Sequence, residues 1–265
     1  MSFSTNEIKE IVSAISGYNN MDYSNYELSF LKRRFSMIFD LFYIKKTEQF
    51  LELLKSEISR DKVIGEMFVD TSEMFRDPSF WRCLRDEILD RIPKNEATIW
   101  FPNETGESVY SLSIILHEKN IEDGITILCN NPSKYRCKNI IDGILDIKKF
   151  ELNLSNYKRL ENKDLFESYF FNGNESISYY LRTIVKCKQV SYDKTIENEN
   201  VAMIISRNQT LYYNQYLSEK YFETLFKKLQ PGGFLAIGIK EWLPPSIAKK
   251  LIVVNEVEKI YQKAK

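Results

Sequence analysis

Apolar residues recur at helical spacing over residues 5–60. A first helix is predicted by the stripe Ile8, Ile11, Val12 and Ile15, which ends at Gly17. A second helix is predicted over residues 26–42, with an inward stripe of Leu28, Leu31, Phe35, Ile38 and Phe39. A third is predicted over residues 47–59, with buried Phe50, Leu51, Leu54 and Ile58. We therefore expect the first part of the chain to be helical.

Beyond residue 96 short apolar runs alternate with helical stretches. Strands are predicted over residues 97–101, 125–129, 201–205 and 234–238, and helices over 107–119, 135–141 and 218–229. This order is typical of a parallel sheet with right-handed crossovers. The pattern predicts an α/β protein with an N-terminal helical domain, residues 1–75, and a parallel-sheet domain, residues 76–265.

Two stretches interrupt the strand-helix order. Residues 144–195 are less regular and contain two predicted short strands, 176–181 and 183–187. We interpret this region as an insertion that adds a small antiparallel element to the main sheet. Residues 231–233, Pro-Gly-Gly, predict a turn before the last strand.

Residues 69–81 form the seam between the two predicted domains. Asp77 suits a helix N-cap and Pro78 suits the first helical position, so a helix is predicted over residues 78–92. Arg76 would stand just before that helix. A cation in this position faces either a structural carboxylate or a ligand, and position alone favours the structural interpretation.

Composition limits the partners and the location that we expect for the protein. The 37 basic residues balance the 37 acidic ones, so no global field attracts nucleic acid or an anionic membrane. The N-terminus has no apolar signal core, and no run approaches the roughly 18 apolar residues of a membrane span. We therefore expect a cytoplasmic monomer with no direct membrane insertion.

Metal and disulfide chemistry is not indicated. The four cysteines show no CxxC spacing, and His117 is the single histidine. We interpret the thiols as buried or half-buried and His117 as a residue near the end of a helix. The sequence thus predicts no metal site, and a histidine base would depend on one poorly placed residue.

Polar residues follow three of the predicted parallel strands, where ligands of open sheets bind. The three clusters are Thr105-Gly106-Glu107, Asn130-Asn131 and Ser206-Arg207-Asn208. A loop-to-helix turn after the first strand and a polar residue after the second suit a nucleoside-containing cofactor. No Walker-type phosphate cradle is present, which disfavours a nucleotide triphosphate.

Several blocks in order carry a resemblance to a known family. They are Leu31-Lys32-Arg33-Arg34, Met74-Phe75-Arg76-Asp77-Pro78, Ile99-Trp100 through Thr105-Gly106-Glu107-Ser108-Val109-Tyr110-Ser111, Ser206-Arg207-Asn208 with Leu211-Tyr212-Tyr213, and Pro231-Gly232-Gly233. Over nearly its full length the chain resembles the CheR chemotaxis-receptor methyltransferases. These enzymes transfer a methyl group from S-adenosylmethionine to glutamate side chains of receptor proteins.

The resemblance implies a Rossmann-like S-adenosylmethionine-dependent methyltransferase domain and S-adenosylhomocysteine as the product. It implies these cofactor-binding residues: Asp70, Ser72, Arg76, Glu107, Asn131, Asp193 (or its neighbour Lys194), Arg207 and Asn208. It also implies that Arg76, Arg207 and Tyr212 serve methyl transfer. Lys32, Arg33 and Arg34 would contact an acidic helix of a chemoreceptor-like partner, although such a cation cluster is more often a solvated helix face.

The chain departs from the family at the cofactor site. The turn after the first strand reads Phe101-Pro102-Asn103-Glu104 instead of a Gly/Ala-rich stretch and is one residue shorter. Ser108 replaces the second acid of the usual GEE, and neutral Asn131 replaces the ribose-binding acid. Three alternatives stay open: a protein-glutamate methyltransferase, a non-catalytic CheR-like binding or scaffold protein, and methyl transfer to another acceptor such as a small molecule.

Overall fold

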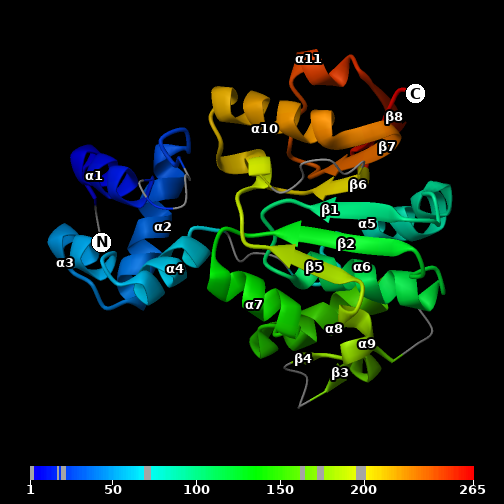
Figure 1. Cartoon of the computed structure of the whole chain (residues 1–265), viewed down its shortest axis with the longest axis horizontal. Helices are drawn as coiled ribbons and strands as arrows, with labels where there is room; N and C mark the ends of the chain where they lie inside the picture. Colours follow the sequence, from blue (N-terminus) through cyan, green and yellow to red (C-terminus); the bar gives the residue numbers. More distant parts are fainter. Residues whose placement is uncertain are drawn as a thin grey trace.

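A seven-stranded sheet forms the centre of the protein, in the order β5-β2-β1-β6-β7-β9-β8 (Figure 1). The computed structural model describes residues 3–16, 18, 22–68, 73–161, 165–171, 176–194 and 201–265. The strands are β1 (Ala97–Phe101), β2 (Ile125–Asn130), β5 (Val185–Lys188), β6 (Val201–Ser206), β7 (Leu229–Ile237), β8 (Leu251–Asn255) and β9 (Ile260–Lys263). The strands from β5 to β7 are parallel, whereas β9 is antiparallel to β7 and β8.

The strand order reverses next to β1, which pairs with β2 on one side and with β6 on the other. The chain winds outward from β1 to β2 and β5, and then returns to start the second half at β6. In open parallel sheets, the crevice beyond the carboxyl ends of the strands at such a reversal binds the ligand. The fold therefore places a candidate site beyond the ends of β1 and β6.

Helices cover both faces of the sheet, which explains why the central strands are almost continuously apolar. One face packs Ile99, Phe101 and Ile127 against α6 (Glu107–Glu118). The opposite face packs Trp100 and Leu128 against α10 (Gln215–Lys228) and α11 (Pro245–Ala248). Alternation along β1 thus divides its side chains between two hydrophobic cores. The parallel-sheet prediction is confirmed.

The N-terminal helices pack into a hydrophobic cluster of their own and lie beside the sheet (Figure 1). They are α1 (Thr5–Ser16), α2 (Leu28–Leu41), α3 (Thr47–Leu53) and α4 (Glu57–Glu66). All four predicted stripe residues of α1 are buried. In α2 the prediction for Leu28 is wrong, because this side chain is 40% exposed at the first helical position.

The predicted helix over residues 47–59 is two helices, because the chain turns at residues 54–56 and starts again. Ser56 caps α4, and its Oγ accepts a hydrogen bond from the Ser59 N–H. The new helix has a different phase from α3, so Ile58 is 73% exposed and its predicted burial is wrong. Phe50 and Leu54 are buried as predicted.

Two sets of contacts fasten the N-terminal helices to the sheet. The Asp61 carboxylate on α4 accepts hydrogen bonds from the backbone N–H groups of Lys134 (2.7 Å) and Tyr135 (2.8 Å), at the start of α7 (Lys134–Asp142). The second contact joins the start of α2 to the segment after β6, where the Glu27 N–H donates to the Tyr212 carbonyl at 2.8 Å. A ligand between the helices and the sheet would therefore lie between two anchored walls.

The helix that follows the seam changes its winding along its length. It begins as α5 (Pro78–Cys83), continues as a π-helix, η1 (Leu84–Ile88), and ends as a 3-10 turn, η2 (Leu89–Arg91). Pro78 occupies the first position as predicted. Asp77 occupies the N-cap position as predicted, but its side chain makes no cap hydrogen bond and its φ is 55°. The Asp77 carboxylate instead faces the candidate site.

The inserted region differs from its prediction in one respect. It contains η3 (Ile147–Lys149), α8 (Phe150–Lys158), η4 (Phe166–Tyr169), β3 (Phe170–Phe171), β4 (Ser176–Ile177), α9 (Tyr179–Arg182) and η5 (Tyr192–Lys194). The small antiparallel pair is β3 with β4, separate from the main sheet. The predicted strand 176–181 continues as α9, and the one predicted at 183–187 is β5, which lies parallel to β2.

The C-terminal part adds elements that the sequence pattern did not predict. Residues 231–233 are not a turn but part of β7, next to a register shift against β6. After β7 the chain forms α11 and the antiparallel strands β8 and β9 at the edge of the sheet. The 3-10 turn η6 (Thr210–Tyr212) precedes α10.

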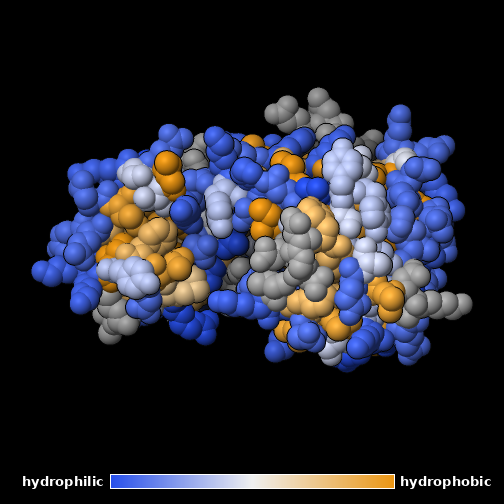
Figure 2. All heavy atoms as spheres, turned by 90° about the horizontal axis from the view of Figure 1, so that it is seen from below, coloured by the Kyte–Doolittle hydropathy of each residue, from blue (hydrophilic) through white to orange (hydrophobic). Residues whose placement is uncertain are grey.

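The face of the molecule seen in Figure 2 is mainly hydrophilic. In that view apolar residues gather in two areas, one over the N-terminal helices and one over the sheet unit. Within the described ranges, no helix combines the length and apolar content needed to cross a bilayer.

Candidate active site beyond the ends of β1 and β6

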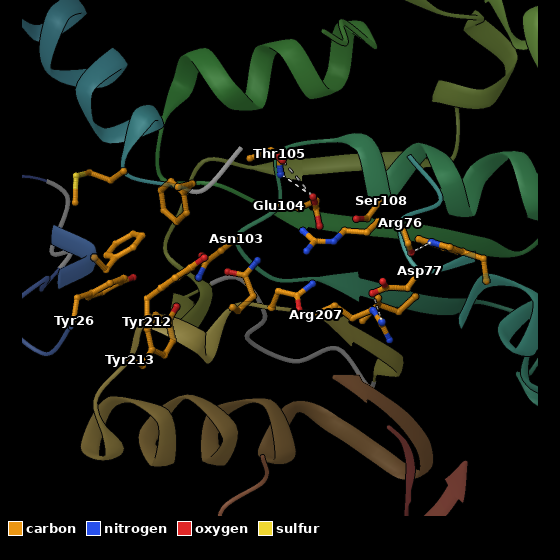
Figure 3. A pocket seen from close by; sticks show the side chains of 17 residues that line it. Tyr26, Arg76, Asp77, Asn103, Glu104, Thr105, Ser108, Arg207, Tyr212 and Tyr213 are labelled. Carbon is orange, nitrogen blue, oxygen red and sulfur yellow. Dashed lines mark hydrogen bonds and ion pairs between the residues drawn. The ribbon is translucent and has the colours of Figure 1, made fainter. Parts of the chain in front are cut away.

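A pocket opens between the ends of β1 and β6 and the N-terminal helices (Figure 3). Four residues predicted for the site line it: Arg76, Arg207, Asn208 and Tyr212. Others come from the turn after β1, namely Asn103, Glu104 and Thr105. Residues far apart in sequence are thus brought together at the reversal of strand order.

The seam holds Arg76 in place through its backbone. The Trp81 Nε1–H donates to the Arg76 carbonyl at 2.9 Å, and the Phe75 N–H donates to Ser111 Oγ on α6 at 2.9 Å. One residue earlier, the Met74 N–H donates to Asn153 Oδ1 on α8 at 3.0 Å. The Arg76 side chain enters the pocket on the side where Glu104 and Ser108 lie (Figure 3).

Arg207 connects β6 to the seam. Its Nη2 forms an ion pair with Asp77 Oδ2 at 2.8 Å, and its Nη1 donates to the Ile237 carbonyl at 3.2 Å. The guanidinium carbon lies 4.0 Å from the centroid of the Phe80 ring, within the range of a cation–π contact. Arg207 therefore stabilises the wall of the pocket as well as lining it.

Asn208 and Tyr212 complete the wall on the β6 side. The Asn208 N–H donates to Glu241 Oε2 at 2.7 Å, and a Cβ at Gly238 would lie 2.6 Å from Asn208 Oδ1. The Tyr212 ring stacks on Phe30 of α2, with centroids 4.4 Å apart and planes 20° apart. Glu241, which the sequence did not single out, also accepts from the Thr210 N–H and thereby shapes this loop.

The first loop, residues 102–106 between β1 and α6, carries three polar side chains, of which Asn103 and Glu104 are buried. Asn103 is 2% exposed and adopts a left-handed φ of 55°, which asparagine tolerates better than most residues. Its Nδ2 has no hydrogen-bond partner among the described residues, although its Oδ1 accepts from Asn130 Nδ2 at 3.2 Å. A buried amide donor that faces a pocket without a partner is expected to bind a ligand atom or water.

Glu104 is the second polar side chain of the first loop and is 9% exposed. Its Oε1 accepts a hydrogen bond from the Thr105 N–H at 2.9 Å. Burial raises the pKa of Glu104 to about 7, and the carboxylate of Glu107 adds to the rise. The sequence signal for both residues was only their polarity directly after a buried strand, and the prediction treated them as departures from a family motif.

In the second loop, residues 130–133 at the end of β2, the buried asparagine side chains form hydrogen bonds within the protein. Asn131 is fully buried: its Nδ2 donates to the Glu104 carbonyl at 3.1 Å, and its Oδ1 accepts from the Ser133 N–H at 2.9 Å. Asn130 Oδ1 accepts from the Trp100 Nε1–H at 3.0 Å. Asn131, predicted to bind ribose, therefore joins the two loops and does not line the pocket.

Glu107 lies behind the first loop at the start of α6. Its side chain accepts from Thr105 Oγ1 at 3.1 Å, and Lys149 Nζ lies 3.8 Å from its Oε1. The carboxylate is buried and does not line the pocket, while its neighbour Ser108 does. The position of Glu107 near the helix N-terminus suits a negative charge.

The remaining predicted residues lie elsewhere. Asp193 is an exposed residue of η5 that accepts a hydrogen bond from Ser191 Oγ, away from the pocket. Asp70 and Ser72 lie outside the described residues, so their predicted contacts stay predictions.

The basic cluster on α2 is not one solvated face. Arg33 is exposed and Lys32 half-buried, but Arg34 is 9% exposed and its Nη1 donates to Met37 Sδ at 3.3 Å. Arg34 points inward because it follows Leu31 by one helical turn. A partner surface on this helix would therefore be formed by Lys32 and Arg33.

Thiols and metal ligands do not form a second centre in the part of the chain that the structure describes. All four cysteines are free, three of them buried and Cys187 half-buried. No group of three or more residues that could hold a metal ion occurs there. His117 lies near the end of α6, with its Nδ1 3.0 Å from Glu122 Oε1.

Known proteins resemble this chain over most of its length. Residues 70–260 match the family described as CheR methyltransferase, SAM binding domain. "Putative methyltransferase Cher3" of Pseudomonas putida is 24% identical over 248 residues, which are 89% of this chain and 88% of that protein. "Chemotaxis protein methyltransferase 2" of Vibrio cholerae is 25% identical over 193 residues, 68% of this chain and 64% of that protein.

Similarity to solved structures is weaker. The O-methyltransferase NovP aligns with 78% of this chain and 89% of its own, at 13% identity and a TM-score of 0.40. A score this low carries no argument.

The pocket fits the cofactor of the matched family. S-adenosylmethionine has an ammonium, a carboxylate and a sulfonium. The pocket presents a carboxylate at Glu104, the guanidinium of Arg76 and an amide donor at Asn103 that has no partner in the described part of the chain. The pocket also lies where an open parallel sheet binds nucleoside-containing ligands. The chain is a member of the CheR methyltransferase family, and its cofactor is S-adenosylmethionine.

Proposed function

We propose that the protein methylates glutamate side chains of a chemoreceptor-like protein. The observation that carries this proposal is the convergence of Arg76, Arg207, Asn208 and Tyr212 on one pocket beyond β1 and β6. The substrate class comes from the family and from the name of the Vibrio cholerae relative, a chemotaxis protein methyltransferase. We further propose two domains, residues 1–75 and 76–265, because the N-terminal helices have their own hydrophobic cluster.

The proposed reaction needs no general base. A glutamate side chain has a reference pKa of about 4.3 and is ionised near neutral pH. S-adenosylmethionine, when bound, supplies a methyl group activated by the sulfonium. The work of the protein is to align the acceptor carboxylate, exclude water and balance charge.

The two arginines are suited to different parts in this scheme. Arg207 is engaged by Asp77, by carbonyls and by the Phe80 ring, so it supports the wall of the pocket. Arg76 lines the pocket from the opposite side and is the better candidate to orient the acceptor carboxylate. The Tyr212 ring, stacked on Phe30, closes the end nearest the N-terminal helices.

Calorimetric titration with S-adenosylmethionine and S-adenosylhomocysteine tests the cofactor half of the proposal. We expect both to bind, and no heat at millimolar ligand would contradict enzymatic function. Methyl transfer to glutamate-containing receptor peptides tests the substrate half. Arg76→Ala should lower transfer by about tenfold to a hundredfold. Arg82→Ala is the matched control, because Arg82 lies on α5, six residues after Arg76, but donates to the Arg159 carbonyl outside the pocket.

A non-catalytic scaffold is the second candidate. The glycine-poor first loop and the internally satisfied Asn131 favour it, because both differ from the family pattern. This candidate predicts association with a receptor-like partner and no cofactor binding.

The partner surface is proposed at Lys32 and Arg33 on α2. Reversing both charges should weaken association with an acidic receptor segment severalfold and reduce its salt dependence. Unchanged binding at low salt would return these residues to the solvated surface.

A further inference from the structure

The first loop contains two buried polar groups that the fold does not use. Glu104 Oε1 is held by the Thr105 N–H, but no described residue forms a hydrogen bond or ion pair with Glu104 Oε2. Asn103 Nδ2 is likewise without a partner. Both residues line the pocket, and both are more than nine-tenths buried. The same pocket is therefore lined by an acceptor and a donor that no described residue uses.

We propose that Glu104 Oε2 receives a positively charged group of the cofactor, either the ammonium or the sulfonium, and that Asn103 Nδ2 donates a hydrogen bond to the same ligand. This inference rests on the proposed use of S-adenosylmethionine at this pocket. It assigns to this chain a charged contact at the position where the resembling family has small, uncharged residues.

A structural function for Glu104 is disfavoured by its surroundings. A buried carboxylate without a cation costs stability, and it is normally paired or neutralised. The nearby carboxylate of Glu107 increases this cost, and Lys149 lies on the side of Glu107, 3.8 Å from it. Arg76 lines the same side of the pocket, but no ion pair joins it to Glu104 within the described ranges. A cation supplied by a ligand would therefore offset the cost of burying the Glu104 charge.

The backbone of the loop explains how the side chains reach the pocket. In a glycine-rich turn the ligand approaches the backbone itself, because no Cβ is in the way. Here Asn103 takes the left-handed conformation at φ 55°, and the turn is one residue shorter than the family pattern. In this chain two side chains of the loop enter the pocket, where a glycine-rich turn would let the ligand approach the backbone.

The reaction supplies a direct way to identify the bound cation. S-adenosylmethionine carries the sulfonium charge, whereas S-adenosylhomocysteine has lost it together with the methyl group. Both retain the ammonium. Removing the Glu104 charge should therefore weaken S-adenosylmethionine alone if the sulfonium is bound, and both ligands equally if the ammonium is bound.

The test is calorimetric titration at pH 8 of the wild type, Glu104→Gln and Glu122→Gln with both ligands. Glutamine keeps the oxygen that Thr105 requires but removes the charge. We expect Glu104→Gln to weaken binding by about tenfold or more, because a charged hydrogen bond is lost. Glu122→Gln makes the same change of charge beside His117, outside the pocket, and should bind as the wild type does.

Asn103→Gly removes the amide donor, together with the Oδ1 that accepts from Asn130 Nδ2. Asn130 Nδ2 keeps its bond to the Val190 carbonyl. Glycine accepts the positive φ, so the loop conformation is retained while the side chain is removed. We expect severalfold weaker binding of both ligands, and unchanged binding would overturn the part assigned to Asn103. Thermal unfolding of each variant confirms that it is folded.

The outcomes separate the two proposals. Wild-type affinity in Glu104→Gln, with a wild type that binds, overturns this inference and leaves the proposed function intact. A wild-type protein that binds neither ligand overturns the proposed function, and this inference fails with it.

Discussion

The loops that follow β1 and β2 are neighbours with similar composition, but they differ in whether their buried polar side chains have hydrogen-bond partners. Both follow buried parallel strands, and both place asparagines out of contact with solvent. In the second loop the side-chain oxygen and nitrogen of Asn131 are both hydrogen-bonded within the protein. In the first loop no described residue forms a hydrogen bond with Asn103 Nδ2 or Glu104 Oε2. A buried polar side chain therefore indicates a ligand only when its hydrogen-bonding capacity is left unused.

The largest expected effect is on the second loop. Asn131→Ala removes the bonds to the Glu104 carbonyl and to the Ser133 N–H and leaves both groups buried without partners. We expect the free energy of unfolding to fall by about 2–4 kcal/mol. Asn103→Gly should cost about 1 kcal/mol or less, because its amide nitrogen has no partner among the described residues and Asn130 Nδ2, which loses Asn103 Oδ1, still donates to the Val190 carbonyl. Equal losses in urea denaturation would contradict the distinction between the loops.

Glu104→Gln should stabilise the empty protein, and the gain should depend on pH. The pKa of Glu104 is raised from 4.5 to about 7, so between these values the folded protein holds a proton that the unfolded chain has released. Stability contributed by this group therefore falls as pH rises through that window. The cost reaches about 3 kcal/mol above pH 7 and is small near pH 4.5.

Urea denaturation of both proteins at pH 5 and pH 8 measures this difference. The advantage of Glu104→Gln should be larger at pH 8. A constant difference would show that the carboxylate is not neutralised by burial.

Cofactor affinity should also depend on pH, but it should rise with pH where the stability of the empty protein falls. If Glu104 binds a cation in its ionised form, affinity for S-adenosylmethionine should fall about tenfold between pH 8 and pH 6, since the pKa of Glu104 is about 7. Glu107, Asp77, Arg76 and Arg207 lie around the same region, so the matched measurement is the pH profile of Glu104→Gln. That profile should be flat over this range, and two parallel profiles would assign the titration to another group.

The smallest expected effect tests the edge of the second loop. Ser133 caps α7, where its Oγ accepts from the Arg136 N–H at 3.3 Å and donates to Asp61 at 3.2 Å. Ser133→Ala should lower the free energy of unfolding by about 1 kcal/mol. Cofactor affinity should not change, because Ser133 does not line the pocket. A loss of affinity would show that the second loop takes part in binding.

Much of the fold could be predicted because its signals are local. The apolar runs of β1, β2 and β6 and the helical stripe of α1 each fix one element by periodicity. The predictions were wrong where tertiary contacts decide. The Asp77 side chain makes no cap hydrogen bond and instead forms an ion pair with Arg207, which is 130 residues away in the chain. The strand at 183–187 became parallel because it pairs with β2.

The site was predictable to a lesser extent. Family motifs pointed to Arg76, Arg207, Asn208 and Tyr212, and all four line one pocket because of the topology. Their functions stay predictions. The motifs could not show that Asn131 would be satisfied internally, because this depends on the distance to the Glu104 carbonyl. Nor could they show that the first loop holds polar groups without described hydrogen-bond partners, because such partners come from residues that are close only in the folded structure.

The Asp61 contact with α7 has a consequence for measurements of motion. The backbone amide protons of Lys134 and Tyr135 are donated to a carboxylate on the N-terminal helices. Their exchange with deuterium from solvent requires that contact to break, whereas amides in the interior of α7 are protected by the helix itself. The exchange rates of these two amides therefore report how often the N-terminal helices lift away from the sheet and expose the pocket.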